Sequence, residues 1–248
     1  PLGRRIRRAF VAAPGHVLLS ADYSQIDLRV LAHLSGDPAL CEAFAAGGDV
    51  HARTASQVFG VALDQVDKEM RRRAKAVNFG VVYGQTGHGL SRGLGISRTE
   101  AQEFINGYFA RYAGVKVWID ATMRQAKAEG SVRTLLGRVR RFPDLSTKNV
   151  RLRMAAERMA VNTPIQGGSA DLIKKAMVDI HRELSAGRRK AVMLLQVHDE
   201  LVFEVSKKDA AAFGSWAKAV MEAAVPLKVP VVVDLKAGVN WDEMEPLP

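Results

Sequence analysis

The spacing of apolar residues predicts strands near both ends of the chain and helices between them. Residues 17–22 (VLLSAD) form an apolar run typical of a buried strand, and helical spacing follows as far as Gly36. Residues 38–191 have mostly helical spacing, with a small hairpin at 132–142. Apolar runs at 192–197 and 201–205 predict a second hairpin, before a helix at 208–224 and a strand at 229–235. This order predicts an α+β fold.

Glycine and proline add two local predictions. The glycines of residues 84–93 match neither a phosphate-binding loop nor a dinucleotide fingerprint, so they predict a loose turn. Pro164 lacks a backbone N–H and crowds the preceding turn, so it predicts a kink or break in the helical segment 149–184.

One helical segment, residues 71–84 (RRRAKAVNFGVVYG), has cations and aromatic residues at four-residue spacing. Each such step rotates a helix by only about 40°, so Arg71, Lys75, Phe79 and Tyr83 share one stripe. Two cations followed by two aromatic rings suit a ligand with phosphates at one end and a flat ring at the other, which is a nucleotide. The alternative is an amphipathic helix with a solvated basic face.

Carboxylates follow or join the predicted strands. Asp22 ends the first strand, where it could bind a metal or substrate, or could cap the next helix. Asp199 and Glu200 lie at the tip of the second hairpin, which is either a surface turn or a metal site, because an uncompensated buried charge is costly. Successive strand residues face opposite ways, so these two acids are not expected to serve one ion equally.

A second polar stripe lies in the helical segment 149–184. Arg158, Asn162 and Gln166 stand four residues apart and can donate hydrogen bonds from one face. The DNA minor groove presents acceptors at equivalent places on every base pair, so these donors could monitor duplex shape. A polar outer face, or hydrogen bonding between helices, is the alternative.

Composition narrows the class of partner. The 248 residues carry a net charge of +10 and a sequence pI near 9.9, which favours a polyanionic partner. No apolar run reaches the roughly 18 residues of a membrane span, and the single cysteine, Cys41, excludes a disulfide framework. The chain opens at Pro1 with no initiator Met, which indicates a fragment of a longer protein.

These features together indicate phosphoryl-transfer chemistry. Asp22 and Asp199 offer the hard oxygen ligands that suit Mg²⁺ bound together with substrate phosphates. Two-metal phosphoryl transfer needs carboxylates for the ions, cations for the phosphates and a platform for the base. We therefore expect folding to bring these two carboxylates together.

Three motifs in this order resemble those of family A DNA polymerases, the bacterial DNA polymerase I group. Residues 22–29 (DYSQIDLR) resemble motif A, residues 71–84 resemble motif B on the O helix of the fingers, and residues 196–200 (QVHDE) resemble motif C. Residues 49–51 (DVH), 134–138 (TLLGR), 166–167 (QG) and 240–242 (NWD) also follow the family order. The resemblance covers essentially the whole chain, and the ordered trio is highly specific.

The resemblance implies a template-directed DNA polymerase core that transfers a nucleotide from a dNTP to a primer 3′-OH and releases pyrophosphate. It implies that Asp22 and Asp199 bind two Mg²⁺ ions, with the Tyr23 backbone carbonyl as a further ligand and Glu200 as a neighbouring catalytic acid. Lys75 is implied to donate a proton to the leaving pyrophosphate.

The resemblance also implies contacts with nucleotide and DNA. The incoming triphosphate is expected to bind Arg71, Lys75 and His51. Phe79 is expected to pack on the sugar and base and, as Phe rather than Tyr, to discriminate against dideoxynucleotides, while Tyr83 stacks at the template position and moves as the fingers close. Residues implied to contact primer and template are Arg158, Asn162, Gln166 and His198.

In domain terms, the resemblance implies a palm with a small antiparallel sheet from residues 1–36 and 146–248, and large, mostly helical fingers from 37–145. The family's thumb and upstream palm precede this region, and no nuclease domain is included. We therefore expect weak, distributive activity and an incomplete palm sheet with an exposed edge. The implied setting is a monomer in the bacterial cytoplasm, at the nucleoid and not in a membrane, whose partners are primer–template DNA, dNTPs and the parent's thumb.

One residue departs from the family pattern. Asp27 stands where the family usually has Glu, an acid that shields the space beside the sugar 2′ position and hydrogen-bonds the tyrosine matching Tyr83. Because Asp is one methylene shorter, we expect weaker exclusion of ribonucleotides. Asp27 is thus a further expected nucleotide contact.

Three other functions remain open at this point. A non-enzymatic nucleic-acid-binding module is disfavoured because both Asp22 and Asp199 are retained. A single-subunit RNA polymerase shares a palm of this type, but motifs A and B have the DNA polymerase form. A helical protein with a basic surface would make the ordered motifs a coincidence.

Overall fold

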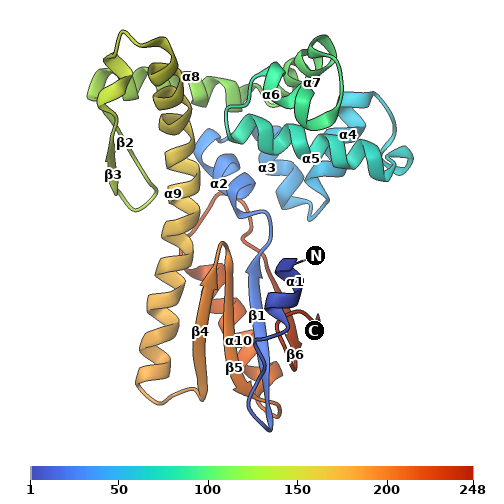
Figure 1. Ribbon diagram of the computed structural model, residues 1–248, viewed down its shortest axis with the longest axis vertical. Helices are drawn as coiled ribbons and strands as arrows, with labels where there is room; N and C mark the ends of the chain where they lie inside the picture. Colours follow the sequence, from blue (N-terminus) through green and yellow to red (C-terminus); the bar gives the residue numbers. More distant parts are fainter. Residues whose placement is uncertain (1, 248) are drawn as a thin grey trace. The chain divides into compact units, whose positions relative to one another are not determined.

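The computed structural model describes residues 2–247 and confirms the α+β fold class (Figure 1). The helices are α1 (Leu2–Arg7), α2 (Ile26–Ser35), α3 (Pro38–Ala45), α4 (Val50–Phe59), α5 (Lys68–Val82), α6 (Gly87–Leu94), α7 (Arg98–Arg111), α8 (Ala113–Glu129), α9 (Val150–Ser185) and α10 (Ala210–Ala223), with 3₁₀ turns η1 (Leu63–Gln65) and η2 (Pro143–Ser146). The strands are β1 (His16–Tyr23), β2 (Ser131–Arg133), β3 (Val139–Arg141), β4 (Ala191–Val197), β5 (Glu200–Ser206), β6 (Val233–Gly238) and β7 (Met244–Pro246). No helix within residues 2–247 combines the length and the apolar content needed to cross a membrane.

Internal contacts divide the chain into two compact units. Unit 1 comprises Pro1–Ile26, Ser169–Pro226 and Val231–Pro248. Unit 2 comprises Asp27–Gly168 and Leu227–Pro230.

Unit 1 is built on a five-stranded antiparallel sheet in the order β4-β5-β1-β6-β7 (Figure 1). The two-residue side-chain period turns Leu19 and Tyr23 of β1 toward α10, and Phe203 of β5 packs edge-on against Phe213 of that helix, with ring centroids 5.2 Å apart. Burying side chains of this size contributes about 1.5–3 kcal/mol each. The alternate residues of β1, including Ser20 and Asp22, therefore face away from α10.

The edge strand β4 pairs only with β5 among the described residues. Val192, which is paired with Glu204, and Leu194, where the register shifts, are 57% and 45% exposed. Among the described residues, the sheet therefore ends at a strand that carries exposed apolar side chains.

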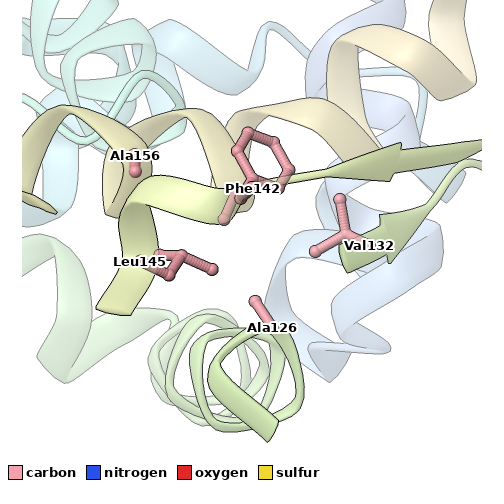
Figure 2. Packing of buried hydrophobic residues seen from close by; sticks show 6 residues of the cluster. Ala126, Val132, Phe142, Leu145 and Ala156 are labelled. Atoms are coloured by element: carbon pink, nitrogen blue, oxygen red, sulfur yellow. The ribbon is translucent and has the colours of Figure 1, made fainter. Parts of the chain in front are cut away.

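Unit 2 is mostly helical. Its helices α4 and α5 pack along each other, and α6 and α7 form a second pair. A small core joins α8, the β2–β3 hairpin, η2 and the first part of α9 (Figure 2). Its buried residues are Ala126, Val132, Phe142, Leu145, Ala156 and Ala160.

Several helix starts form where the sequence places a capping residue. Asp49 accepts hydrogen bonds from the backbone N–H groups of His51 and Ala52 at the start of α4. Ser97 accepts one from the N–H of Glu100 at the start of α7, at 3.1 Å. Both helices lie within the segment 38–191, where the spacing of apolar residues predicts mostly helix.

Three local predictions are wrong. The glycines at 87, 89 and 93 lie in helix α6, where the Thr86 cap and the burial of Leu90 outweigh the cost of glycine in a helix. The break considered at Pro164 does not occur, because helix α9 continues through it, with Val161 and Ile165 buried on either side. The last predicted strand begins four residues later, at Val233, because its predicted start includes Pro230, which cannot donate to the ladder.

Gly238, at the end of β6, is a position where we expect substitution to destabilise unit 1. A Cβ atom there would lie 2.1 Å from the backbone oxygen of Glu243, which no side-chain rotation relieves. We expect Gly238→Ala to lower the free energy of unfolding by about 2–3 kcal/mol. Urea unfolding of the two proteins measures this difference.

The matched control is Gly107→Ala within α7. No atom lies within 4 Å of a Cβ atom built there. Alanine should therefore stabilise that helix by about 0.5–1 kcal/mol. An unfolding midpoint for Gly238→Ala equal to that of the wild type would contradict the close approach.

Candidate active site

Three carboxylates lie side by side on the sheet face of unit 1 that points away from α10. Asp22 of β1 is paired directly with Glu200 of β5 on one side and with Asp234 of β6 on the other. Side chains at directly opposed positions share a face and lie about 5 Å apart. The sheet thus carries a row of three acids across adjacent strands.

Asp199 joins this row from the β4–β5 turn. The backbone N–H of Tyr23 donates a 3.1 Å hydrogen bond to the backbone oxygen of Asp199, which fixes the turn beside the end of β1. His198, the exposed residue before it, has a φ of 55°, a left-handed conformation that is unusual outside glycine. The fold therefore brings together Asp22 and Asp199, which are far apart in sequence.

The proximity of these acids changes the protonation of Asp22. Burial, together with the charges of Asp199, Glu200 and Asp234, raises the pKa of Asp22 to about 6, against the opposing charge of Lys236. Asp22 lies within β1, and α2 begins only at Ile26, so the interpretation of Asp22 as a helix cap is wrong.

Glu200 is held by neutral donors. Its Oε1 accepts hydrogen bonds from Ser20 Oγ at 2.6 Å and from Trp241 Nε1 at 2.9 Å. Trp241 is itself held by the edge of Phe10 and by the guanidinium of Arg7, which lies 4.5 Å from its ring centroid. These contacts give the Glu200 carboxylate a fixed orientation.

A cavity of about 920 Å³ in unit 1 is lined by the carboxylate row and also reaches Lys218 on α10. Its lining includes the four acids and Asp242, together with three cations, Arg7, Lys218 and Lys236. This volume and mixed charge suit a large, charged ligand rather than a small apolar one.

Sequence reasoning missed Asp234, Lys236 and Trp241. The predicted strand at 229–235 ended before Lys236. Its apolar first residues made the alternation of apolar and polar residues in β6 hard to recognise. The pattern VDLKAG, with polar residues at every second position, is the signal that would have found the first two.

The donor set fits a hard divalent ion. Carboxylates gathered this closely need a nearby positive charge to remain ionised together. No group of three or more His, Cys, Asp or Glu side chains within residues 2–247 is arranged to hold an ion by itself. An ion bound by Asp22 and Asp199 would thus take further oxygen ligands from the backbone, water or substrate.

In unit 2, the stripe along α5 lies at the surface. Arg71 and Lys75 are exposed, and Phe79 and Tyr83 are half-buried. The Lys75 ammonium lies 5.9 Å from the centroid of the Phe79 ring, and the rings of Phe79 and Tyr83 are nearly parallel, at 13°, with centroids 6.1 Å apart. The face thus presents cations and then flat rings, in the order a nucleotide would need.

His51 lies against this stripe but is buried. Only 2% of the residue is exposed, its ring centroid is 5.8 Å from that of Phe79, and its Nδ1 is 2.8 Å from Asn78 Nδ2. Burial lowers its pKa to about 4, so the imidazole is neutral at pH 7. A phosphate contact from His51 would therefore be a hydrogen bond from a neutral ring.

The end of α5 is connected to two other predicted site residues of unit 2. Tyr83 Oη donates a 3.0 Å hydrogen bond to Asp27 Oδ2, so the shorter acid still reaches the tyrosine. Asn162 Nδ2 donates to the Tyr83 backbone oxygen at 3.4 Å.

The remaining residues of the second polar stripe lie on the same helix, α9. Arg158, near Gly84, and Gln166 are exposed. The Asn162 contact with the end of α5 is a hydrogen bond between helices, which is the alternative interpretation for that residue, whereas exposed Arg158 and Gln166 stay predicted DNA contacts.

Comparison with known proteins identifies the family. The sequence profile of DNA polymerase family A matches residues 1–243. DNA polymerase I of Caldicellulosiruptor bescii is 49% identical over 97% of this chain, and the thermostable DNA polymerase I of Thermus aquaticus is 51% identical over 97%. The chain spans only 28% and 29% of those two relatives.

A solved structure shares the fold. It is described as the POL domain of Pol1 from M. smegmatis in complex with DNA primer-template and dNTP. The match covers 97% of this chain and 42% of the chain in that structure, with a TM-score of 0.92 and 44% sequence identity. With a family profile that matches nearly every residue, the chain belongs to DNA polymerase family A.

Proposed function

We propose that this chain is the catalytic core of a template-directed DNA polymerase, which transfers a nucleotide from a dNTP to a primer 3′-OH and releases pyrophosphate. The observation that carries the proposal is the meeting of Asp22 and Asp199 on one sheet face, where like charges raise the pKa of Asp22. The family and the DNA- and dNTP-bound neighbour support it.

Asp22 and Asp199 are proposed to hold two Mg²⁺ ions, with the Tyr23 backbone carbonyl as a further ligand. When bound, such ions neutralise charge on the attacking and leaving oxygens. The Tyr23 side chain has a fixed position, because its hydroxyl donates a 2.6 Å hydrogen bond to the Met221 backbone oxygen on α10. Glu200, fixed by Ser20 and Trp241, is proposed to act beside the ions.

The α5 face is proposed to bind the incoming nucleotide. Arg71 and Lys75 would bind its phosphates, with His51 as a neutral donor, and Lys75 would give a proton to the leaving pyrophosphate. Phe79 would pack on sugar and base and discriminate against dideoxynucleotides. Tyr83 would stack at the template position and move when the fingers close.

The remaining proposed contacts are with DNA. Arg158, Asn162 and Gln166 present donors along α9, and His198 presents its exposed ring from the β4–β5 turn. The net charge of +10 supports a nucleic-acid partner.

The setting of the chain is proposed from the same family. Unit 1 corresponds to the palm and unit 2 to the fingers, in a monomer that works with the parent's thumb at the bacterial nucleoid. The expected domain boundaries, 1–36, 37–145 and 146–248, differ from the limits of the units because α2 and the first part of α9 belong to unit 2.

Primer extension tests the proposed function. The chain, with Mg²⁺ and dNTPs, is expected to add single nucleotides to a primed template, slowly and with release after each addition. A version joined to the upstream thumb is expected to extend further per binding event. EDTA should stop both reactions.

Two outcomes would count against this proposal. Binding of primer–template without any metal-dependent extension, by the chain or by its thumb-containing version, would favour a non-enzymatic binding module. Processive extension by the chain alone would contradict the proposed need for the thumb.

Asp27→Glu is expected to improve rejection of ribonucleotides. Restoring one methylene places more bulk beside the sugar 2′ position, and one methylene in a binding site is worth about tenfold in discrimination. The measurement is the ratio of dNTP to rNTP incorporation in the thumb-containing protein.

Asp27→Asn is the matched control, because it keeps the length of the side chain and removes its charge. An Asn oxygen can still accept the hydrogen bond that Tyr83 Oη now donates to Asp27. If Asp27→Glu leaves the ratio at its wild-type value, side-chain length at this position does not set sugar selection.

A further inference from the structure

Asp49 links the starts of two helices in unit 2. Its Oδ1 accepts hydrogen bonds from the N–H groups of His51 at 2.9 Å and Ala52 at 3.1 Å, which caps α4. Its Oδ2 accepts a 2.5 Å hydrogen bond from Arg71 Nε, in the first turns of α5. One carboxylate therefore serves both as a helix cap and as an ion-pair partner.

This carboxylate lies among the cations of the proposed phosphate site. The charges of Asp49, Arg71 and Lys75 all act on the pKa of His51, so the four groups form one electrostatic cluster. Burial alone would raise the pKa of Asp49, but the hydrogen bonds from Arg71 and Ala52 bring it below its usual value, so Asp49 is charged at pH 7. The cluster thus contains a negative group at the place where phosphate oxygens are proposed to bind.

A carboxylate and a phosphate make the same kind of contact with a guanidinium. Both offer oxygen acceptors to its planar N–H donors. The Arg71 and Asp49 side chains are 46% and 37% exposed, so a ligand from solvent can reach the pair. Ion pairs this exposed are weak, so a triphosphate can displace the carboxylate.

We propose that Asp49 competes with the nucleotide phosphates for Arg71 and so lowers the affinity of the α5 face for triphosphates. This inference depends on the proposed function, since it concerns the same nucleotide site. In the absence of nucleotide, Asp49 keeps the Arg71 side chain beside α4. When a triphosphate binds, its oxygens replace the carboxylate on Arg71, while Oδ1 continues to cap α4.

The test is Asp49→Asn, which separates the two roles. Asparagine caps helices as well as aspartate does, but it carries no charge, and its amide N–H₂ cannot accept from Arg71. The substitution removes the ion pair that competes for Arg71, and it removes the repulsion between the Asp49 carboxylate and the phosphates. The Kd for dATP should therefore fall by about threefold to tenfold. Isothermal titration calorimetry of the chain with dATP, without DNA, measures this change.

The control is Glu69→Gln on the same helix. Glu69 pairs with Arg72 and Arg73, which lie off the stripe, so the substitution removes an equal charge without releasing Arg71. We expect its dATP affinity to stay within about twofold of the wild-type value. Pyrophosphate should bind Asp49→Asn more tightly, as dATP does, whereas deoxyadenosine, which has no phosphate, should bind both proteins alike.

The outcomes separate this inference from the proposed function. Wild-type affinity or weaker binding of dATP by Asp49→Asn, with unchanged circular dichroism, overturns the inference and leaves the nucleotide site intact. Asp49→Ser, a second uncharged cap, must show the same tightening. Failure of the wild-type chain to bind dATP or pyrophosphate at all overturns the nucleotide site and the inference together.

Discussion

Changing Asp199 to asparagine is expected to slow single-nucleotide addition by about a thousandfold or more. The substitution keeps the size of the side chain but removes one of two carboxylates proposed to hold the ions. Without this carboxylate, the transition state loses several kcal/mol of electrostatic stabilisation. Each tenfold change in rate corresponds to about 1.4 kcal/mol, which gives this magnitude. Extension of a labelled primer, followed in the thumb-containing protein at saturating Mg²⁺, measures the rate.

The stability of the same variant shows whether the lost rate reflects chemistry or unfolding. The folded-state pKa of Asp22 is about 6, above its ordinary value of 3.8, and the charge of Asp199 is one cause. Ionisation of Asp22 therefore disfavours the folded state, so stability should fall as pH rises from about 4 to 6, by on the order of 1–2 kcal/mol.

Asp199→Asn removes part of this repulsion. Its melting temperature at pH 7 should equal or exceed that of the wild type, and its loss of stability between pH 4 and 6 should be smaller. A folded variant with a rate within tenfold of the wild type would refute the assignment of Asp199.

Lys75→Ala is expected to give the second largest effect, a loss of about a hundredfold to a thousandfold in kcat. This range is typical of a missing proton donor, and Lys75 is exposed in the middle of α5, where alanine preserves the helix. Pre-steady-state incorporation at varied dNTP concentration separates kcat from KM.

Lys75→Arg provides the chemical control. Arginine keeps the positive charge but does not release its proton in this pH range, so KM should return toward the wild-type value while kcat stays low. Arg72→Ala removes a charge from the same helix away from the stripe and should change kcat by less than about threefold. Full recovery of kcat in Lys75→Arg would mean that the charge, and not the proton, is what Lys75 supplies.

The parts of the site that local pattern encodes were predictable from the sequence. The strand ending at Asp22 and the hairpin around Asp199 follow from apolar runs separated by polar residues, and the α5 stripe follows from a four-residue period. The Asp49 cap was predictable for the same reason, because it depends only on the N–H groups that follow it.

Contacts between distant segments were not predictable in this way. The bond from Trp241 to Glu200 spans 41 residues, and the pairing of Asp22 with Asp234 depends on strand register, which local periodicity does not specify. The ion pair of Asp49 with Arg71 likewise depends on how α4 packs against α5.

Helix α6 shows the limit of intrinsic preference. Three glycines in eight residues favour a loop, yet burial of Leu90, Ser91 and Leu94 stabilises a helix. Pro164 within α9 is a similar case, in which packing on both sides outweighs one missing hydrogen bond.

The edge strand β4 has a practical consequence for handling this protein. Its unpaired backbone groups and the exposed side chains of Val192 and Leu194 can pair with the same strand of a second molecule, so turbidity should increase with protein concentration. Lysine at either position would add a charge to this edge, and at position 192 it would lie opposite Glu204, four residues along β5 from Glu200. Such a gatekeeper is expected to give a more soluble sample.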